Sequence, residues 1–460
     1  MNTPRLLRLL CVCTLAAAQP AVSLEAEDAA APAACPNVPL QQLIDAHPGE
    51  IIFIPAGYYS ISEALRVQAN GTGLWGPGTI VQTDDDQDIL SIDGVSGVRI
   101  EGITLTRAEG RQESSRHALA ARNCRDIEIR NVRVINNHSS AGTVYLENCR
   151  DAVVSGCTVR NYKRIGVDDR TASELYGYAF RVIDGTGILV NAGRNIGIHA
   201  NRVIEDRLFP TAETKEEHQL GFLTDGKLPT RKGRLAPPGD YANNWHQGSA
   251  IVVTSPEESS HVTVSNNQIQ NAAQGIDLHA DHVTCTANDI DHAFIGIKCM
   301  HGSRNVIIAN NNISHMDLWG IIMMPGTASH PAEPATDAHP ARGANFTRGN
   351  IIANNIFSDF GYGYEHFNWK DSVSGVISLE SGQLPENPVM TDVIIQGNIV
   401  YDTAGEGELR DGQVVPEPPR YEYAVFISDT PRPERLTFIG NMFPPGSRGI
   451  SNIPLEEFRE

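Results

Sequence analysis

The sequence has no apolar run long enough to cross a membrane. The run that comes nearest, Leu9–Ala18, is too short to span a bilayer. It follows two arginines and precedes small residues near Ala21, which is the pattern of an export signal. We therefore expect residues 1–23 to be removed and the mature protein to be secreted or periplasmic, with no inserted segment.

Positive charge is also scarce. The chain has 36 Lys and Arg against 55 Asp and Glu, a formal net charge of −19. Nucleic acids and anionic membranes attract basic surfaces, so this balance argues against both as general partners. It also disfavours a polyanionic substrate, unless a local basic cleft overrides the field of the whole protein.

Cysteines are few for a chain of 460 residues. Cys11 and Cys13 belong to the export signal, and the mature protein keeps Cys35, Cys124, Cys149, Cys157, Cys285 and Cys299. No CxxC pair and no His/Cys cluster with zinc spacing occurs. The composition therefore argues against a disulfide scaffold and against a structural zinc site.

Aromatic residues make up only 6% of the chain, whereas glycine is abundant at 41 residues. One repeated pattern accounts for both. Short alternating apolar residues, then Asn or Gly, then another apolar pair recur in segments that begin at residues 98, 127, 152, 196, 262, 283, 306 and 393. This order is typical of strand, bend, strand.

The repeat has the length of one coil of a parallel β-helix. Val262 and Val283 are 21 positions apart, and Val283 and Val306 are 23 apart. Solenoids built from such repeats pair each coil only with its neighbours.

Equivalent positions in successive repeats carry the same polar residues. Asn267, Asn288 and Asn311 are placed as expected of an asparagine ladder inside a coil corner. Cys124 and Cys149 also lie one repeat apart, and neighbouring coils are about 4.8 Å apart. A disulfide and a stacked pair of thiols both fit that separation.

The start of the repeat region adds a capping element. A short amphipathic helix over Leu40–Ala46, a turn, a buried strand and a Pro-x-Gly turn precede the first coil. With the repeats, this order resembles the N-terminal cap of the pectate-lyase-like right-handed β-helix superfamily, which includes pectate and alginate lyases, polygalacturonases and mannuronan epimerases. The resemblance implies an all-β fold, a single-stranded right-handed parallel β-helix over residues 36–445, with a flexible segment at 24–35 and a C-terminal tail at 446–460.

Five segments break the period and are expected to be loops: 161–184, 205–247, 325–348, 362–388 and 402–421. Loops on a rigid repeat often supply the binding surface. The longest contains Lys227, Arg231, Lys232 and Arg234. It is either a basic lid over an acidic protein or a solvated loop.

The segment from residue 274 to 305 gathers most of the candidate chemistry. Alternation along its strands directs Ile276 and Ile297 into the core. Asp277 and Lys298 then face outward as neighbours on adjacent coils, with His279 one pleat further along. The catalytic candidates are Asp277, His279, Lys298 and His301.

Lyases and epimerases of acidic sugars need a group that neutralises the uronate carboxylate, a base for the proton α to it, and often an acid for the leaving oxygen. Lys298 suits the first role, and His279 suits the second or the third. Asp277 either orients Lys298 or ligates calcium, which prefers oxygen ligands. The alternative is an ordinary surface ion pair among solvated histidines.

A second set of side chains is predicted to bind substrate. His292 and His315 hold equivalent positions in successive repeats, and Trp319 offers a platform on which a sugar ring stacks. The substrate-binding candidates are His292, His315, Asp317, Trp319, Tyr364, His366 and Trp369.

Two family patterns resemble parts of this segment. The polygalacturonase pattern matches in the Gly-Ile-Asp that ends at Asp277 and the Ile-Lys that ends at Lys298, but its catalytic aspartates fall at Gln274 and near Ala293. The Gly-His-Gly motif of that family is missing. The Tyr-Gly-Phe-Asp-Pro-His motif of mannuronan epimerases is similar at the Gly, Asp and His positions, which end at His279.

An inverting hydrolase needs two placed carboxyl groups, for which Asp168 and Asp169 are the candidates. We predict a secreted, carbohydrate-active β-helix that cleaves a uronate-containing polysaccharide by β-elimination. A glycoside hydrolase, a uronate C-5 epimerase and a noncatalytic carbohydrate-binding protein are the alternatives. No motif calls for a cofactor, and Ca2+ is the one candidate metal.

Overall fold

The computed structural model describes residues 39–173, 177–207, 241–242, 248–336, 340–360, 373, 375–382 and 384–458. The chain divides into Met1–Ala31, which lies outside the described residues, and Pro32–Glu460. The predicted export signal and Cys35 are therefore not described. No helix among the described residues is long and apolar enough to span a membrane.

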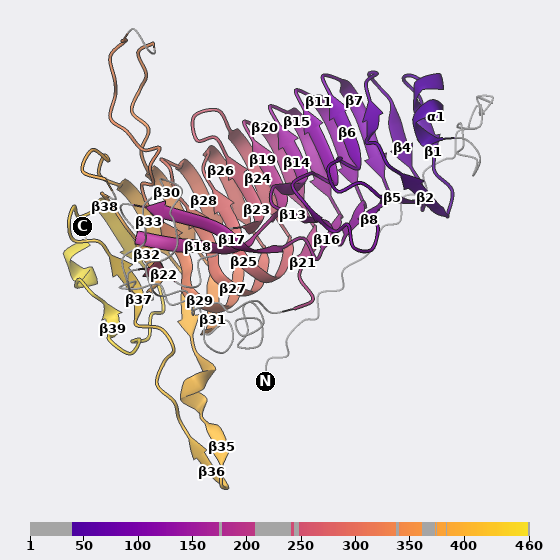
Figure 1. Cartoon of the computed structure of the whole chain (residues 1–460). Coiled ribbons are helices and arrows are strands. Elements are labelled where there is room, and N and C mark those ends of the chain that lie inside the picture. Colours follow the sequence, from indigo (N-terminus) through magenta and orange to yellow (C-terminus); the bar gives the residue numbers. More distant parts are fainter. Residues whose placement is uncertain are drawn as a thin grey trace, which may run out of the picture. The chain divides into compact units, whose positions relative to one another are not determined.

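A short helix, α1 (Leu40–Ala46), precedes the coils, and this confirms the predicted capping helix. Leu40 and Ile44 are one helical turn apart and are both buried. They join the core cluster that runs through the coils, and α1 contacts β3 (Leu65–Val67). The helix lies at the start of the stack (Figure 1).

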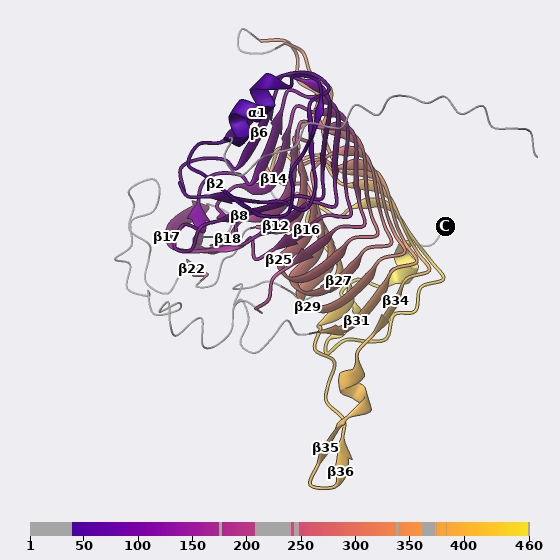
Figure 2. The ribbon, with the colours of Figure 1, turned by 90° about the vertical axis from the view of Figure 1, so that its right-hand side faces the viewer.

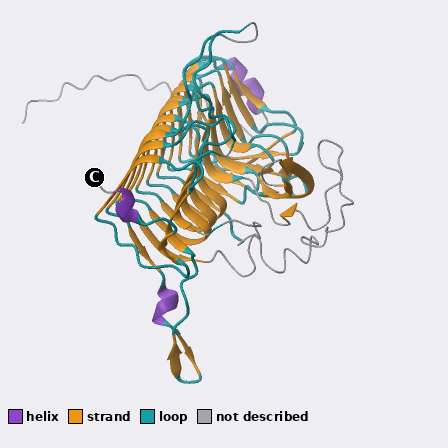
Figure 3. Cartoon of the chain, turned by 90° about the vertical axis from the view of Figure 1, so that its left-hand side faces the viewer, coloured by secondary structure: helices purple, strands orange, loops and turns teal. Residues whose placement is uncertain are grey.

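Twelve parallel strands form the first face of the coils. In order they are β1 (Ile51–Phe53), β4 (Gly73–Trp75), β7 (Ser96–Glu101), β11 (Arg125–Arg130), β15 (Arg150–Ser155), β20 (Arg194–His199), β24 (Ser260–Ser265), β26 (Asp281–Thr286), β28 (Arg304–Ala309), β30 (Arg348–Ala353), β33 (Thr391–Gln396) and β38 (Glu434–Ile439). Figure 3 shows them as a continuous orange stack.

The second and third faces belong to one 20-stranded sheet, because three long strands turn the corner between them without interruption. These are β25 (Gln268–Leu278), β27 (Asp289–Cys299) and β29 (Asn312–Met323). The second face holds their C-terminal halves with β3, β6 (Leu90–Asp93), β10 (Leu119–Arg122), β14 (Gly142–Glu147), β19 (Thr186–Asn191), β23 (Ser249–Thr254), β32 (Gly375–Leu379), β37 (Tyr423–Ile427) and β39 (Gly449–Ser451). The third face holds their N-terminal halves with β2 (Tyr58–Ile61), β5 (Thr79–Gln82), β8 (Thr104–Arg107), β12 (Arg133–Ile135), β16 (Thr158–Arg160), β21 (Arg202–Ile204), β31 (Ile356–Phe360) and β34 (Ile399–Tyr401). The predicted parallel β-helix is confirmed.

The asparagine ladder is confirmed and is longer than predicted. Each side-chain nitrogen donates to the side-chain oxygen of the next member at 2.9–3.0 Å, in the order Asn201, Asn267, Asn288, Asn311, Asn355, Asn398 and Asn441. The amides also bond to backbone groups, as when Asn288 Nδ2 donates to the carbonyl of Val264 at 3.0 Å. All of these side chains except the half-buried Asn441 are buried, so their mutual bonds satisfy amide groups that water cannot reach.

Cys124 and Cys149 are free, buried thiols stacked on neighbouring coils. The hydrogen bond from Cys149 is the main reason that the pKa of Cys124 is lowered to about 7. Of the two arrangements that fit the spacing, the structure therefore has the thiol pair.

Several segments expected to be loops contain strands, so that prediction was wrong in part. The segment 161–184 holds an antiparallel hairpin of β17 (Arg164–Ser173) and β18 (Gly177–Asp184), which β22 (Tyr241–Ala242) extends. A second hairpin, β35 (Glu408–Arg410) with β36 (Gln413–Val415), projects from the coils beyond the short 3-10 helix η1 (Thr403–Glu406), and Figure 2 shows both hairpins. The basic residues Lys227, Arg231, Lys232 and Arg234 lie outside the described residues.

Two further boundaries differ from the prediction. The segment 362–388, which was expected to be a loop, contains β32, a regular strand of the second face. The sequence does not reveal this strand because insertions on both sides of the coil hide its period. The β-helix also continues past residue 445, since β39 pairs in parallel with β37 and is followed by η2 (Leu455–Phe458). A small additional pair, β9 (Glu113–Ser114) with β13 (His138–Ser139), lies at a corner.

Replacing one ladder member tests how much the ladder contributes to stability. Asn288→Ala leaves the Nδ2 group of Asn267 and the Oδ1 atom of Asn311 buried without one partner each. We expect a loss of about 2–5 kcal/mol in the free energy of unfolding, measured by chemical denaturation, because each orphaned buried group costs about 1–3 kcal/mol. Asn312→Ala, at an exposed neighbour, should change it by less than about 0.5 kcal/mol. Equal losses in the two variants would contradict a structural role for the ladder.

Candidate functional site

The register of the second face brings the predicted catalytic side chains together. Asp277 of β25 lies opposite Lys298 of β27, and Lys298 lies opposite Ile322 of β29. Ile276 and Ile297, next to them in sequence, are fully buried in the core. The alternation predicted for these strands is therefore confirmed.

One carboxylate contacts both an ammonium group and an imidazole. Lys298 Nζ lies 2.8 Å from Asp277 Oδ2, and His279 Nε2 lies 2.7 Å from Asp277 Oδ1. Burial by itself would raise the pKa of Asp277, but the charges of His279 and Lys298 outweigh burial and hold it well below its ordinary value. Asp277 is therefore ionised at any physiological pH.

The other nitrogen of His279 faces a neutral group. His279 Nδ1 lies 3.1 Å from the hydroxyl of Thr254, which ends β23 on the preceding coil. His279 Nε2 contacts Asp277 at ion-pair distance without an aligned hydrogen bond, so the ring has a polar neighbour on both sides. Nδ1 is the nitrogen whose partner a substrate could displace.

His301 completes a group that we call the Asp277 cluster: Asp277, His279, Lys298 and His301. The His301 ring stands edge-on to the His279 ring, with centroids 4.6 Å apart. Burial, followed by the charge of His279, lowers the pKa of His301 to about 3. Its Nδ1 accepts a hydrogen bond from the backbone N–H of Ala328 at 3.3 Å. His301 is therefore a neutral imidazole that carries its proton on Nε2.

The Asp277 cluster is less exposed than the predicted outward patch. The side chains of Asp277, His279 and Lys298 are 8%, 11% and 12% exposed. Ile322 and Ser378, which continue the Asp277 column on the next coils, are fully buried. Alternation decides which face a side chain is on, whereas exposure depends on what packs over that face, and at these coils the face is covered.

Corner geometry explains part of the repeated histidines. His282, His292, His301 and His315 have φ angles of 53°, 59°, 60° and 55°. His, Asn and Asp enter this left-handed region more readily than most residues with a side chain. A histidine at such a corner therefore meets a backbone requirement, whatever else it does.

The predicted substrate-binding residues do not form one groove with the Asp277 cluster. His292 and His315 lie at the corner between the third and second faces, where their rings stack with centroids 4.2 Å apart. Both contact Asp291, which the sequence analysis does not single out. They form a separate group that we call the Asp291 cluster: Asp291, His292 and His315.

Trp319 is not an exposed platform, and that prediction was wrong. It is 8% exposed, and its indole N–H donates to the carbonyl of Val373 at 3.1 Å. Its register places it between Ile295 and Gly375 of the flanking coils, so the stack covers it. Asp317, on the same strand, is half-buried.

Several predicted residues lie outside what the structure describes. Tyr364, His366 and Trp369 fall in an undescribed segment. Asp168 and Asp169 have their backbone in β17, outside the coils, and their side chains are not described. The predicted hydrolase pair is therefore untested.

The surroundings of Asp277 do not fit the suggested calcium ion. Ca2+ takes six to eight oxygen ligands. Both oxygens of Asp277 face nitrogen groups, Lys298 Nζ and His279 Nε2, that compete with a cation. Calcium binding at this carboxylate is not supported.

Two residues on the second face were missed. Thr254 was overlooked because a lone threonine carries no motif. Glu380 follows β32, one coil beyond Met324, and burial raises its pKa to about 7. The apolar residues Val376, Ile377 and Leu379 are the available signal, but the sequence analysis places this segment in a loop.

A groove of about 750 Å³ lies at the next corner, between the second and first faces. It is lined by Asp281, Arg304, Asn305, Gly343, Ala344, Arg348, Gly349 and Asp392. Arg304 pairs with Asp281 at 3.1 Å, and Arg348 lies in register with Arg304 on the following coil. Two arginines and two aspartates line the groove, so the formal charges of its lining balance.

No protein-family model and no curated protein sequence matches the chain. Among solved structures, it is similar to a family 28 exopolygalacturonase from Yersinia enterocolitica, with a TM-score of 0.50 and 12% identity over 87% of this chain and 72% of that one. It is also similar to the A-module of the mannuronan C-5 epimerase AlgE4 from Azotobacter vinelandii (TM-score 0.47, 11% identity, 90% of each chain). A tailspike protein of E. coli bacteriophage HK620 matches with a TM-score of 0.42 and 12% identity over 91% of this chain and 60% of that one.

The similarity to the exopolygalacturonase agrees with the fold class that the sheets define. The protein is a right-handed parallel β-helix, and the resemblance to pectate-lyase-like proteins is confirmed at the level of the fold. At such low identity the likeness does not identify an activity, because this fold carries many chemistries.

Removing Asp277 tests the buried ion pair. Asp277→Ala leaves the Lys298 charge nearly buried without its carboxylate, so we expect a loss of about 3–5 kcal/mol in the free energy of unfolding. The double variant Asp277→Ala/Lys298→Met should recover most of that loss, because it removes the charge as well. Arg435→Ala breaks an exposed pair with Asp392 and should cost less than about 1 kcal/mol. A double variant no more stable than Asp277→Ala would contradict this account.

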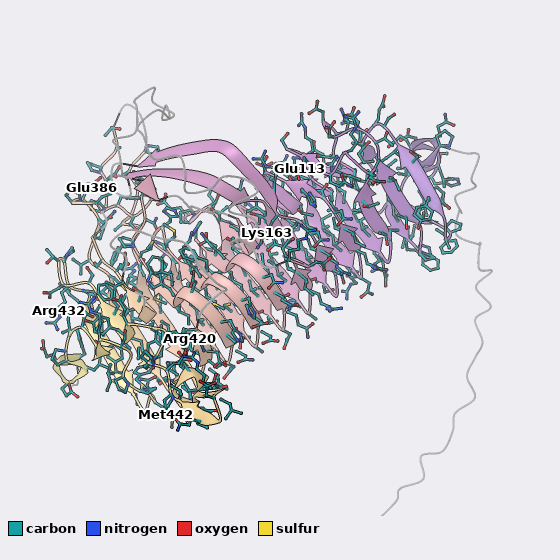
Figure 4. The ribbon with its side chains drawn as sticks, turned by 60° about the horizontal axis from the view of Figure 1, so that its bottom comes forward. Glu113, Lys163, Glu386, Arg420, Arg432 and Met442 are labelled. Carbon is teal, nitrogen blue, oxygen red and sulfur yellow. The ribbon has the colours of Figure 1, made fainter. Side chains whose placement is uncertain are left out.

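Glu380 should make the protein less stable as the pH rises. Its pKa is about 7 in the folded protein against an ordinary value of 4.5, so the folded state binds more protons between these values. Glu380→Gln should remove this loss and, above pH 7, raise the free energy of unfolding by up to about 3 kcal/mol. Chemical denaturation at a series of pH values measures the free energy of unfolding. The control is Glu386→Gln, which changes an exposed residue (Figure 4). If the free energy of unfolding changes with pH in the same way in wild type and Glu380→Gln, Glu380 is not the cause of the pH dependence.

Proposed function

We propose that this protein is a secreted polysaccharide lyase that acts by β-elimination on a uronate-containing polysaccharide. The observation that carries the proposal is the Asp277 cluster, in which one ionised carboxylate fixes an ammonium and an imidazole side by side. The shared fold supports it only in general terms, since an exopolygalacturonase has the same architecture.

Each member of the cluster has a role in the elimination. Lys298 neutralises the uronate carboxylate, which makes the α proton more acidic. His279 Nδ1 takes that proton from C5, and Asp277 stabilises the imidazolium that results. The C–H electron pair becomes the C4=C5 double bond as the C4–O bond breaks, and His279 returns the proton to the departing oxygen.

Two neighbouring features support substrate binding. His301 stays neutral over the working pH range, so its Nε2–H donates a hydrogen bond without adding charge. Arg304 and Arg348 in the adjoining groove attract further uronate carboxylates of the same chain.

Burial of the Asp277 cluster favours a second candidate, a noncatalytic carbohydrate-binding protein. Side chains that are 8–12% exposed leave little surface for a polymer to contact. In that case the ion pairs only join neighbouring coils, and the polysaccharide binds elsewhere, for example at the groove between Arg304 and Arg348.

The test measures the ultraviolet absorbance of the conjugated double bond when mature protein is mixed with alginate, pectate, ulvan or glycosaminoglycans. We expect absorbance to rise with one substrate, and we expect Lys298→Ala and His279→Ala each to lower kcat at least about a hundredfold. His261→Ala, which removes an exposed histidine of the first face, is the matched control and should keep full activity.

The other outcomes identify the alternatives. New reducing ends without absorbance would overturn the lyase in favour of a hydrolase, and inversion at C5 without cleavage would indicate an epimerase. Binding of a polysaccharide with no product, unchanged in Lys298→Ala, would establish the noncatalytic protein.

A further inference from the structure

The Asp291 cluster brings three metal-ligating side chains together from two coils. Asp291 and His292 belong to β27, and His315 belongs to β29. Asp291 Oδ1 lies 2.9 Å from His292 Nδ1 and 2.8 Å from His315 Nδ1. One donor atom from each residue lies within 4.8 Å of the other two, and no other group of three among the described residues meets that limit.

The protein leaves one of these donors unsatisfied. His292 Nδ1 is buried and makes no hydrogen bond, although the Asp291 oxygen is close to it. The same oxygen already accepts hydrogen bonds from Ser314 Oγ and from His315 Nδ1. Buried polar atoms are rarely left without a partner, so His292 Nδ1 calls for one that the side chains do not supply.

The charge of the cluster suits a cation. A carboxylate beside two imidazoles supplies the negative charge and the oxygen atom that a bound cation needs. Arg420, labelled in Figure 4, is paired with Asp402 at 2.8 Å and does not take up this carboxylate.

We propose that Asp291, His292 and His315 bind a divalent transition metal ion through two imidazole nitrogens and one carboxylate oxygen. Two imidazoles and a carboxylate suit divalent first-row transition metals, among which Cu2+ generally binds such ligands most tightly. The ion joins two adjacent coils.

A second stacked pair of histidines shows what the Asp291 cluster has in addition. His261 and His282 stack on the first face with centroids 4.9 Å apart, and His282 Nδ1 lies 2.8 Å from Asp281 Oδ1. That carboxylate is already paired with Arg304 and accepts a hydrogen bond from Asn305. This pair therefore lacks an available carboxylate and serves as an internal control.

The test titrates Cu2+ into mature protein that is purified without a histidine tag and stripped with a chelator. We expect calorimetry to give one ion per chain, and electron paramagnetic resonance to show coupling to two nitrogens. His292→Asn and His315→Asn should each weaken binding at least tenfold, whereas the double variant His261→Asn/His282→Asn should bind as tightly as wild type. Circular dichroism without metal establishes that each variant is folded.

The proposal is independent of the lyase activity, since the two clusters lie at different corners. It is overturned if wild type shows no saturable binding, if both single variants bind as wild type does, or if the His261/His282 variant loses the site. If a single variant fails to fold, the resonance spectrum of wild type decides: a spectrum without coupling to two nitrogens overturns the proposal.

Discussion

The distance between neighbouring coils is the constraint on which the rest of this structure depends. Hydrogen bonds between parallel strands fix that spacing at about 4.8 Å. Any residue type that recurs with the coil period is therefore held next to its copies. The asparagine ladder, the Cys124 and Cys149 thiols, the Asp277–Lys298 ion pair and the two stacked histidine pairs all result from this one spacing. The contacts that stabilise the fold and the candidate chemistry thus have the same origin. The positions of two paired side chains depend on the positions of the coils that carry them.

Corners add a second requirement, which the strands do not have. A corner residue in the left-handed region must be Gly, Asn, Asp or another residue that tolerates positive φ, and several histidines of this chain are found there. His282 and His292 are examples, and both sit beside a carboxylate from the preceding residue. The fold therefore produces paired imidazoles next to acids at its corners. The two carboxylates differ in their partners: Asp281 is paired with Arg304, whereas Asp291 accepts hydrogen bonds from Ser314 and His315.

The candidate site could be predicted from the sequence where a regular period applied, and not beyond. Alternation and the coil length placed Asp277 opposite Lys298 correctly. They could not show that Thr254, from the coil before, meets the free nitrogen of His279, because a single hydroxyl leaves no pattern. The sequence also predicted that Trp319 is an exposed platform, although it is buried and its indole N–H bonds to the carbonyl of Val373. Both errors concern what packs on a residue from outside its own strand.

The sequence by itself determined the repeat, the strand pattern, the capping helix at Leu40–Ala46 and the partners of Asn288 in the ladder, because these follow from local periodicity and a fixed rise per coil. Only the tertiary structure decided which outward residues are covered, which carboxylate oxygens are occupied, and that the histidines separate into an Asp277 cluster and an Asp291 cluster. Exposure and pKa depend on groups brought in by distant coils and insertions, as the raised pKa of Glu380 shows. Those contacts have no period, so no pattern in the sequence records them.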